Sequence, residues 1–153
     1  MSKDIKIKKG LNIPLKGEAD KVFGNANSSD TYLVKPTDFK NFIPKLFVKE
    51  GAEVLAGSPL FYNKEYPDVK VSSPVSGEVV EIIRGAKRKI MGIKILADKE
   101  TRYADFPAAD ASSMSRDDVK KRLLDQGLWS FIKRRPYGTV ARPEDAPLAI
   151  YIS

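Results

Sequence analysis

The side chains of this sequence that could take part in chemistry are carboxylates, lysines and tyrosines, because its 153 residues include no Cys and no His. These absences exclude a thiol nucleophile, an iron–sulfur cluster ligated by this chain, a Ser-His-Asp triad and a Cys/His zinc site. Four carboxylates fall in predicted turns: Glu50, Glu53, Glu65 and Asp68. Their spacing does not identify a pair that could act together as general acid and general base. We therefore expect no catalytic residue and no metal ligand in this chain.

One short segment, residues 127–138, combines aromatic and basic side chains and reads GLWSFIKRRPYG. Its candidate binding residues are Trp129, Phe131, Lys133, Arg134, Arg135 and Tyr137. These side chains could line a slot for a planar ring, or dock on an acidic patch of a neighbouring protein. A third interpretation is that Trp129 and Phe131 belong to a core while the cations face water. The sequence leaves all three interpretations open.

The net charge of +7 comes from 27 basic and 20 acidic side chains. It is compatible with nucleic acid, an anionic membrane surface, an acidic protein partner or a merely solvated basic surface. The basic residues are spread along the chain, without a recognition helix or an aromatic RNA-binding motif, so we expect no nucleic-acid partner. The basic turn at residues 84–89 is solvated, or it faces anionic lipid or a partner. No stretch approaches the roughly 18 apolar residues of a membrane span.

The elements that would position these residues are mainly short strands. Alternating patterns predict a strand over residues 5–15 and another at residues 32–34, stopped by Pro36. Between residues 46 and 96, short apolar runs alternate with turn signals at Gly51, Gly57, Gly77 and residues 84–89. Such spacing favours a small sandwich or barrel.

The composition changes after about residue 98. A linker of small residues leads to Ser115, which has an acid three residues later and so predicts a helix N-cap, and Gly127 predicts the end of that helix. The apolar run at residues 146–153 predicts a buried strand of a parallel sheet. A buried strand with no partners after it suggests that the chain is an N-terminal piece of a longer protein.

Two motifs carry a resemblance to a known fold. Residues 48–60 (VKEGAEVLAGSPL) and 73–82 (SPVSGEVVEI) resemble a barrel-sandwich hybrid of the biotinyl and lipoyl type. In that family a modified lysine lies seven residues before the residue that precedes the proline of the second motif. Counting back from Ser73 reaches Tyr66, with Lys64 and Lys70 on either side. We therefore expect an unmodified domain, and a carrier module for biotin or lipoate is the alternative.

A second resemblance covers essentially the whole chain. Residues 5–15 (IKIKKGLNIPL), the unmodified barrel-sandwich segment and residues 127–137 (GLWSFIKRRPY) resemble, in this order, the N-terminal third of the NqrA family of the Na⁺-translocating NADH:quinone oxidoreductase, Na⁺-NQR. That family is similar to the RnfC component of the Rnf complex and to the flavin- and NADH-binding subunit of respiratory complex I. These relatives have a glycine-rich phosphate loop after the helix, where bulky residues such as Trp129 stand here. Their flavin function therefore does not transfer.

The resemblance implies the fold class and its division into domains. The fold is α+β, mainly β. A barrel-sandwich hybrid with an N-terminal strand segment occupies residues 1–100. A linker, a helix and the first strand of a truncated α/β (Rossmann-like) domain occupy residues 101–153.

The resemblance also implies a function, that of a peripheral component on the cytoplasmic side of the bacterial inner membrane. The complex passes electrons from NADH to ubiquinone and exports Na⁺. We expect no cofactor on this chain, since NADH, flavins, iron–sulfur centres and quinone belong to other subunits, which are its expected partners. The aromatic and basic segment could contribute to quinone binding. A basic module for nucleic acid is the remaining alternative function.

Overall fold

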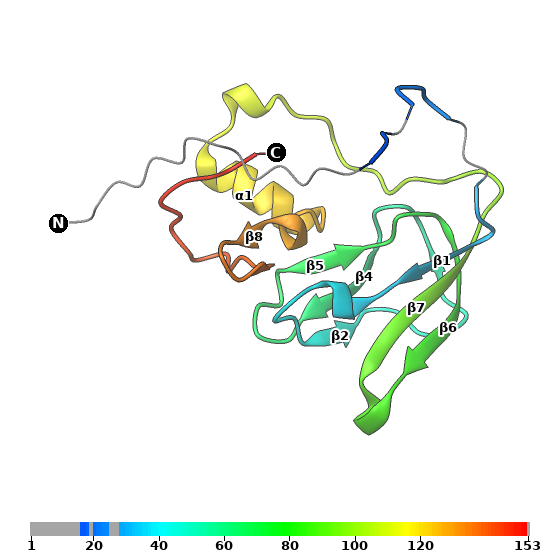
Figure 1. Ribbon diagram of the computed structural model, residues 1–153. Helices are drawn as coiled ribbons and strands as arrows, with labels where there is room; N and C mark the ends of the chain where they lie inside the picture. Colours follow the sequence, from blue (N-terminus) through cyan, green and yellow to red (C-terminus); the bar gives the residue numbers. More distant parts are fainter. Residues whose placement is uncertain (1–15, 19, 25–27, 153) are drawn as a thin grey trace.

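The computed structural model describes residues 16–18, 20–24 and 28–152 (Figure 1). The strand predicted over residues 5–15 lies outside this part of the chain. The strands are β1 Thr31–Val34, β2 Pro44–Leu46, β3 Glu53–Val54, β4 Pro59–Asn63, β5 Lys70–Ser72, β6 Gly77–Arg84, β7 Ile90–Ala97, β8 Lys133–Arg134 and β9 Thr139–Val140. The α-helix is α1 Arg116–Asp125, and short 3₁₀ turns are η1 Pro36–Asp38, η2 Ala86–Arg88, η3 Ala111–Ser113 and η4 Trp129–Phe131.

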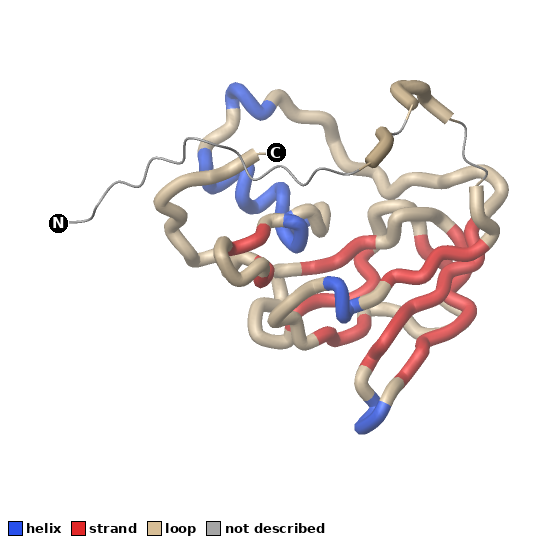
Figure 2. Tube along the Cα trace, in the orientation of Figure 1, coloured by secondary structure: helices blue, strands red, loops and turns tan. Residues whose placement is uncertain are grey.

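The first seven strands form two antiparallel sheets that face each other (Figure 2). One has the strand order β1-β7-β6-β3 and the other β2-β4-β5. Apolar side chains of both sheets are completely buried in the core: Leu60, Phe61, Val79, Ile93 and Ile95. Burying each of them stabilises the fold by about 1.5–3 kcal/mol. The sandwich predicted from the strand spacing is confirmed.

A glycine lets two of these strands approach each other closely. Gly77 begins β6 with φ +152°, and a Cβ at this position would overlap the carbonyl oxygen of Leu96 on β7. Residues with a side chain rarely adopt this conformation, so this position requires glycine. Here it allows the start of β6 to pair closely with the end of β7.

Helix α1 begins and ends where the sequence predicts. The Oγ atom of Ser115 accepts a hydrogen bond from the backbone N–H of Asp118 at 3.2 Å, which is the geometry of an N-cap. Gly127 follows the last turn with φ +75°. The end of the helix then contacts the edge of the barrel, because Ser72 on β5 donates its hydroxyl proton to the carbonyl of Gln126 at 3.2 Å. The turn that follows the helix therefore packs against strand β5.

The linker between the strands and α1 is also attached to the barrel. The N–H of Ala56 donates to the carbonyl of Arg102 at 2.9 Å, and the N–H of Ala104 donates to the carbonyl of Ala56 at 2.8 Å. These bonds form a short parallel bridge between residues 56 and 103. The chain that joins the two predicted domains is thus held along the outside of the barrel (Figure 1).

The buried strand predicted over residues 146–153 is wrong as far as the structure describes it. Residues 146–152 form no strand, and their apolar side chains are exposed, with Leu148 and Ile152 almost completely so. A strand needs a neighbour for its N–H and C=O groups, and none of the described residues supplies one here. An apolar run was therefore not sufficient to predict a strand.

Candidate functional site

The first candidate site is the turn between β4 and β5, where a carrier domain would present its modified lysine. Asn63 is buried just before the turn, and its Oδ1 atom accepts the N–H of Glu65 at 3.2 Å. The N–H of Lys64 donates to the carbonyl of Ile43 at 2.8 Å, and the N–H of Val69 to the carbonyl of Tyr66 at 2.9 Å. These bonds fix Tyr66 at the apex of the turn.

Neither nearby lysine occupies this apex. Lys64 is held against residue 43 by its backbone, and Lys70 lies within β5 opposite Tyr62. Tyr66 itself is half-buried, and the guanidinium of Arg142 lies over its ring, 5.8 Å from the ring centroid. The position at which a carrier arm would emerge therefore holds a tyrosine that a later part of the chain covers.

The second candidate site is the aromatic and basic segment, which begins with a side chain that faces inward. Trp129 is half-buried in η4, and its Nε1–H donates to the carbonyl of Ala141 at 2.9 Å. The neighbouring Ser130 is completely buried and donates its hydroxyl proton to the carbonyl of Gly127 at 3.2 Å. Trp129 is therefore partly buried and hydrogen-bonded to the chain that follows β9.

Phe131 and Lys133 meet a residue from a distant part of the chain, Phe39. The Phe39 and Phe131 rings are packed edge to face, with centroids 6.2 Å apart. The Lys133 Nζ atom lies 4.8 Å from the centroid of the Phe39 ring and donates to the carbonyl of Ser130 at 3.0 Å. Partial burial lowers the pKa of Lys133 below its usual 10.5. Phe131 remains largely exposed beside this cluster.

The remaining candidates lie in the β8–β9 hairpin, beyond Lys133. The Arg134 Nε atom is 3.2 Å from Oδ2 of Asp145. Arg135 and Tyr137 are exposed in the loop between the two strands. The structure therefore divides the six predicted residues between an inward tryptophan, a pair on Phe39, an ion pair and an exposed loop, and does not gather them around one slot.

Two residues that complete these sites were missed in the sequence, Phe39 and Arg142. Phe39 lies just after η1 and contacts Phe42 and Phe61 as well as Phe131. Its aromatic neighbour three residues on was a signal for a cluster, but nothing in the sequence pairs residue 39 with residue 131. The pairing of Arg142 with Tyr66 has no local signal at all.

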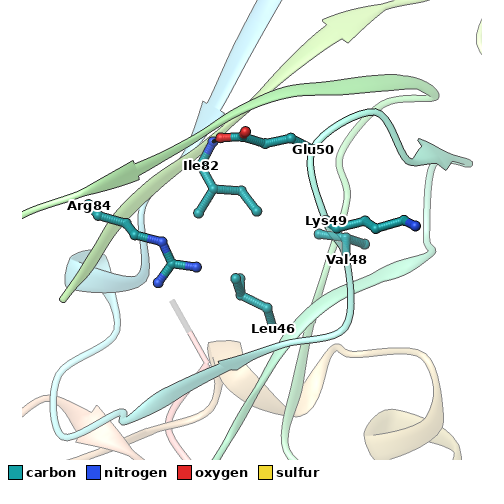
Figure 3. A pocket seen from close by; sticks show the side chains of 6 residues that line it. All are labelled: Leu46, Val48, Lys49, Glu50, Ile82 and Arg84. Carbon is teal, nitrogen blue, oxygen red and sulfur yellow. Dashed lines mark hydrogen bonds between the residues drawn. The ribbon is translucent and has the colours of Figure 1, made fainter. Parts of the chain in front are cut away.

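Two shallow hollows lie on the barrel, and none of the six predicted residues lines either of them. One, of about 260 Å³, is formed by Leu46, Val48, Lys49, Glu50, Ile82 and Arg84 (Figure 3). The other, of about 290 Å³, includes Phe39, Lys40, Ile43 and Lys89. Among the described residues, no group of three or more acidic side chains could hold a metal ion. No helix of the described ranges has the length and apolar character to cross a membrane.

Comparison with known families identifies the scaffold. A family model described as the NqrA N-terminal barrel-sandwich hybrid domain matches residues 5–98, more than half of the chain. The chain belongs to the NqrA family. A second model, the NqrA second alpha/beta domain, matches residues 114–153. These matches confirm the resemblance and the mainly β, α+β fold with its barrel-sandwich hybrid. The exact domain boundary near residue 100 stays a prediction.

Curated relatives in the NqrA family are similar over almost the whole chain. The NqrA component of the Na(+)-translocating NADH-quinone reductase of Vibrio vulnificus is 32% identical over 97% of this chain. The corresponding proteins of Photorhabdus laumondii and Actinobacillus pleuropneumoniae are 34% and 33% identical over the same share. In each case the match covers 34% of the relative. The chain therefore spans about a third of the length of these NqrA relatives.

Proposed function

We propose that this chain works as part of the NqrA component of a Na⁺-translocating NADH-quinone reductase. Its membership of the NqrA family and the names of its relatives support this role. In such a complex electrons pass from NADH to a quinone as Na⁺ is exported, and the carriers belong to other subunits. The chain then acts as a peripheral scaffold on the cytoplasmic side of the membrane, where it contacts those subunits.

The observation that carries the scaffold role is the covered apex of the β4–β5 turn. A carrier domain needs a lysine that projects freely, so that a long arm can swing between active sites. Here Tyr66 stands at the apex, half-buried, with the Arg142 guanidinium over its ring. The adjoining strand β5 is covered by the end of α1. This barrel thus serves as a platform on which a second segment packs.

A chimeric protein tests this role. The chain replaces the aligned third of the Photorhabdus laumondii relative, in cells that lack their own copy of NqrA. We expect the chimera to co-purify with the other subunits and to restore Na⁺-dependent NADH-quinone reductase activity. A matched strain that carries the relative without its aligned third should show neither. A chimera that is soluble and folded but neither assembles nor restores activity would contradict the proposal.

A contribution to quinone binding is a finer proposal for the same chain. It is favoured by the edge-to-face Phe39–Phe131 pair, which lies beside a hollow and carries the Lys133 amine over one ring. Phe131→Ala and Tyr137→Ala in the intact complex should then raise the KM for quinone and weaken inhibition by quinone analogues. Phe47→Ala, at an exposed aromatic residue elsewhere, is the control. Unchanged quinone kinetics and inhibitor sensitivity would remove this proposal.

The carrier alternative predicts a covalent adduct, which the intact mass of the protein reveals. After co-expression with a biotin ligase and a lipoate ligase, we expect the mass given by the sequence alone. An added group on Lys64 or Lys70 would instead show that the turn is a substrate of these enzymes, and the scaffold role would be wrong.

A further inference from the structure

The turn between β6 and β7 forms a basic, projecting end of the molecule (Figure 1). Three consecutive cations, Lys87, Arg88 and Lys89, are exposed there. Lys87 and Arg88 have φ values of +54° and +59°, a region that residues other than glycine seldom adopt. The turn therefore keeps its cations at the surface in an unusual backbone conformation.

Further cations line the two hollows of the barrel. Lys40 lines one hollow together with Lys89, and Lys49 lines the other together with Arg84. The Arg84 guanidinium points into its hollow toward Leu46 and Ile82 (Figure 3). We define the basic end of the barrel by these six residues: Lys40, Lys49, Arg84, Lys87, Arg88 and Lys89.

Acidic groups do little to neutralise the basic end. Among the described residues, the one carboxylate that lines either hollow is Glu50, and its Oε1 atom accepts the N–H of Ile82 at 2.7 Å. Within the part of the chain that the structure describes, the ion pairs involve other cations, namely Lys35, Arg102 and Arg134. The positive charge of the basic end is therefore available to an external anion.

The opposite end of the same hairpin is acidic. Glu53 on β3 stands directly opposite Glu78 on β6, and Asp98 follows the end of β7. Arg102 is the cation that pairs with Glu53 and Asp98. Strand β6 has eight residues and spans the two ends, and the steps of ~3.3 Å from its first residue to its last separate them by roughly 23 Å. Such a charge distribution orients the molecule in front of a negative surface, with the β6–β7 turn leading.

Apolar side chains accompany the cations. Ile43 lines the hollow that contains Lys40 and Lys89, and it is 48% exposed. Met91 is 37% exposed and packs beside Gly85 at the base of the turn. Cations around exposed apolar groups suit the boundary between lipid headgroups and acyl chains. The leading turn is convex and narrow, which fits a bilayer surface better than the broad, complementary contact of a folded protein partner.

We propose that the basic end of the barrel binds the anionic headgroups of phospholipids at a membrane surface. The cations neutralise the headgroup phosphates, and Met91 and Ile43 lie at the level of the headgroups. This surface centres on the β6–β7 turn, and its Lys40 and Ile43 side adjoins Phe39, which contacts Phe131. The proposal concerns a property of the chain itself and does not depend on its assembly with other subunits.

Co-sedimentation with lipid vesicles tests the proposal on the full 153-residue chain. The probes are vesicles of phosphatidylglycerol and phosphatidylcholine mixed, and of phosphatidylcholine alone. We expect binding to the mixed vesicles at low salt, loss of binding at high salt and no binding to the neutral vesicles. A triple variant, Lys87→Glu with Arg88→Glu and Lys89→Glu, should lower the partition into mixed vesicles at least about tenfold.

A second triple variant controls for net charge. Lys99→Glu, Arg116→Glu and Lys121→Glu change three exposed cations remote from the basic end by the same amount of charge. This variant should partition within about twofold of the unchanged protein. Circular dichroism establishes that both variants are folded.

Several results would overturn the proposal. They are the absence of binding to anionic vesicles at low salt, unaltered binding by the variant of the β6–β7 turn, and an equal loss in the control variant. Retention on DNA or an acidic protein that depends on these cations, without vesicle binding, would also overturn it, because the basic end would then serve another anion. Vesicle binding by a chain that fails to restore the complex would refute only the proposed role in the reductase.

Discussion

Gly127 lies where the end of α1 meets strand β5. Its φ of +75° ends α1, and a Cβ there would overlap the Ser72 hydroxyl on β5. Gly138 has a similar φ of +68° but open space around it. A side chain at either position would strain the backbone, but only at Gly127 would it also overlap a neighbour. Comparing substitutions at the two positions therefore distinguishes the effect of strain from that of close packing.

We predict that Gly127→Ala lowers the free energy of unfolding by at least about 2–3 kcal/mol, since strain and overlap with Ser72 add together. Gly138→Ala should lower it by about 1 kcal/mol, from strain alone. Urea denaturation followed by circular dichroism measures both. Equal losses in the two variants would show that α1 does not pack on β5 in this way.

Asp98 is a second residue whose environment has a measurable consequence. Hydrogen bonding by the Ser76 hydroxyl, and then by Arg102, lowers the pKa of the Asp98 carboxyl below its usual 3.8. A carboxyl whose pKa is lowered in the folded state stabilises the fold above its unfolded pKa. That stabilisation is lost as the pH falls through the lowered value.

Asp98→Asn should therefore reduce stability at neutral pH, and the difference from the unchanged protein should shrink as the pH falls below about 4. The measurement is the free energy of unfolding of both proteins between pH 7 and pH 2. A difference that stays constant over this range would mean that ionised Asp98 is not stabilised by Ser76 and Arg102.

At the scale of the elements, α1 depends on its N-cap. Ser115→Ala removes the acceptor for the N–H of Asp118 and should cost about 1 kcal/mol. Ser115→Asn retains an acceptor and should change the stability by less than about 0.5 kcal/mol. Helicity and denaturation midpoints distinguish the two variants. If both lose stability equally, the Ser115 hydroxyl acts through its bond to the Asp118 carboxylate instead of through the cap.

Most of these elements could be predicted because their signals are local. Strand β1 stops before Pro36, Gly77 marks the start of β6, and Ser115 and Gly127 bound α1. Each signal reflects a steric or hydrogen-bonding property of one residue, which the sequence displays directly. Tyr66, at the apex of the β4–β5 turn, could likewise be found in the sequence, by counting back seven residues from Ser73.

The parts that could not be predicted depend on contacts between distant residues. The Phe39–Phe131 pair and the Arg142–Tyr66 pair each join segments more than 70 residues apart. The apolar run at residues 146–152 looked like a strand, but strand formation requires a neighbour that the run itself does not reveal. The segment at residues 127–138 stays a predicted binding segment, and its side chains have different partners.

The whole molecule combines a core, a covered strand edge and a basic end. The inner faces of the two sheets form the core, strand β5 carries the helical segment, and the basic end of the barrel faces outward. The chain thus has the barrel-sandwich hybrid fold of carrier domains, and we propose that its surface serves for attachment. The central claim is that this scaffold belongs to the sodium-translocating reductase.

The most direct test is affinity purification of the tagged protein from detergent-solubilised membranes of the organism that encodes it. Mass spectrometry then identifies the proteins that accompany it. We predict that the membrane-bound, flavin-carrying subunits of a Na⁺-translocating NADH-quinone reductase co-elute with the tagged chain. Co-elution of only soluble carboxylases, acyltransferases or nucleic acid would contradict the account.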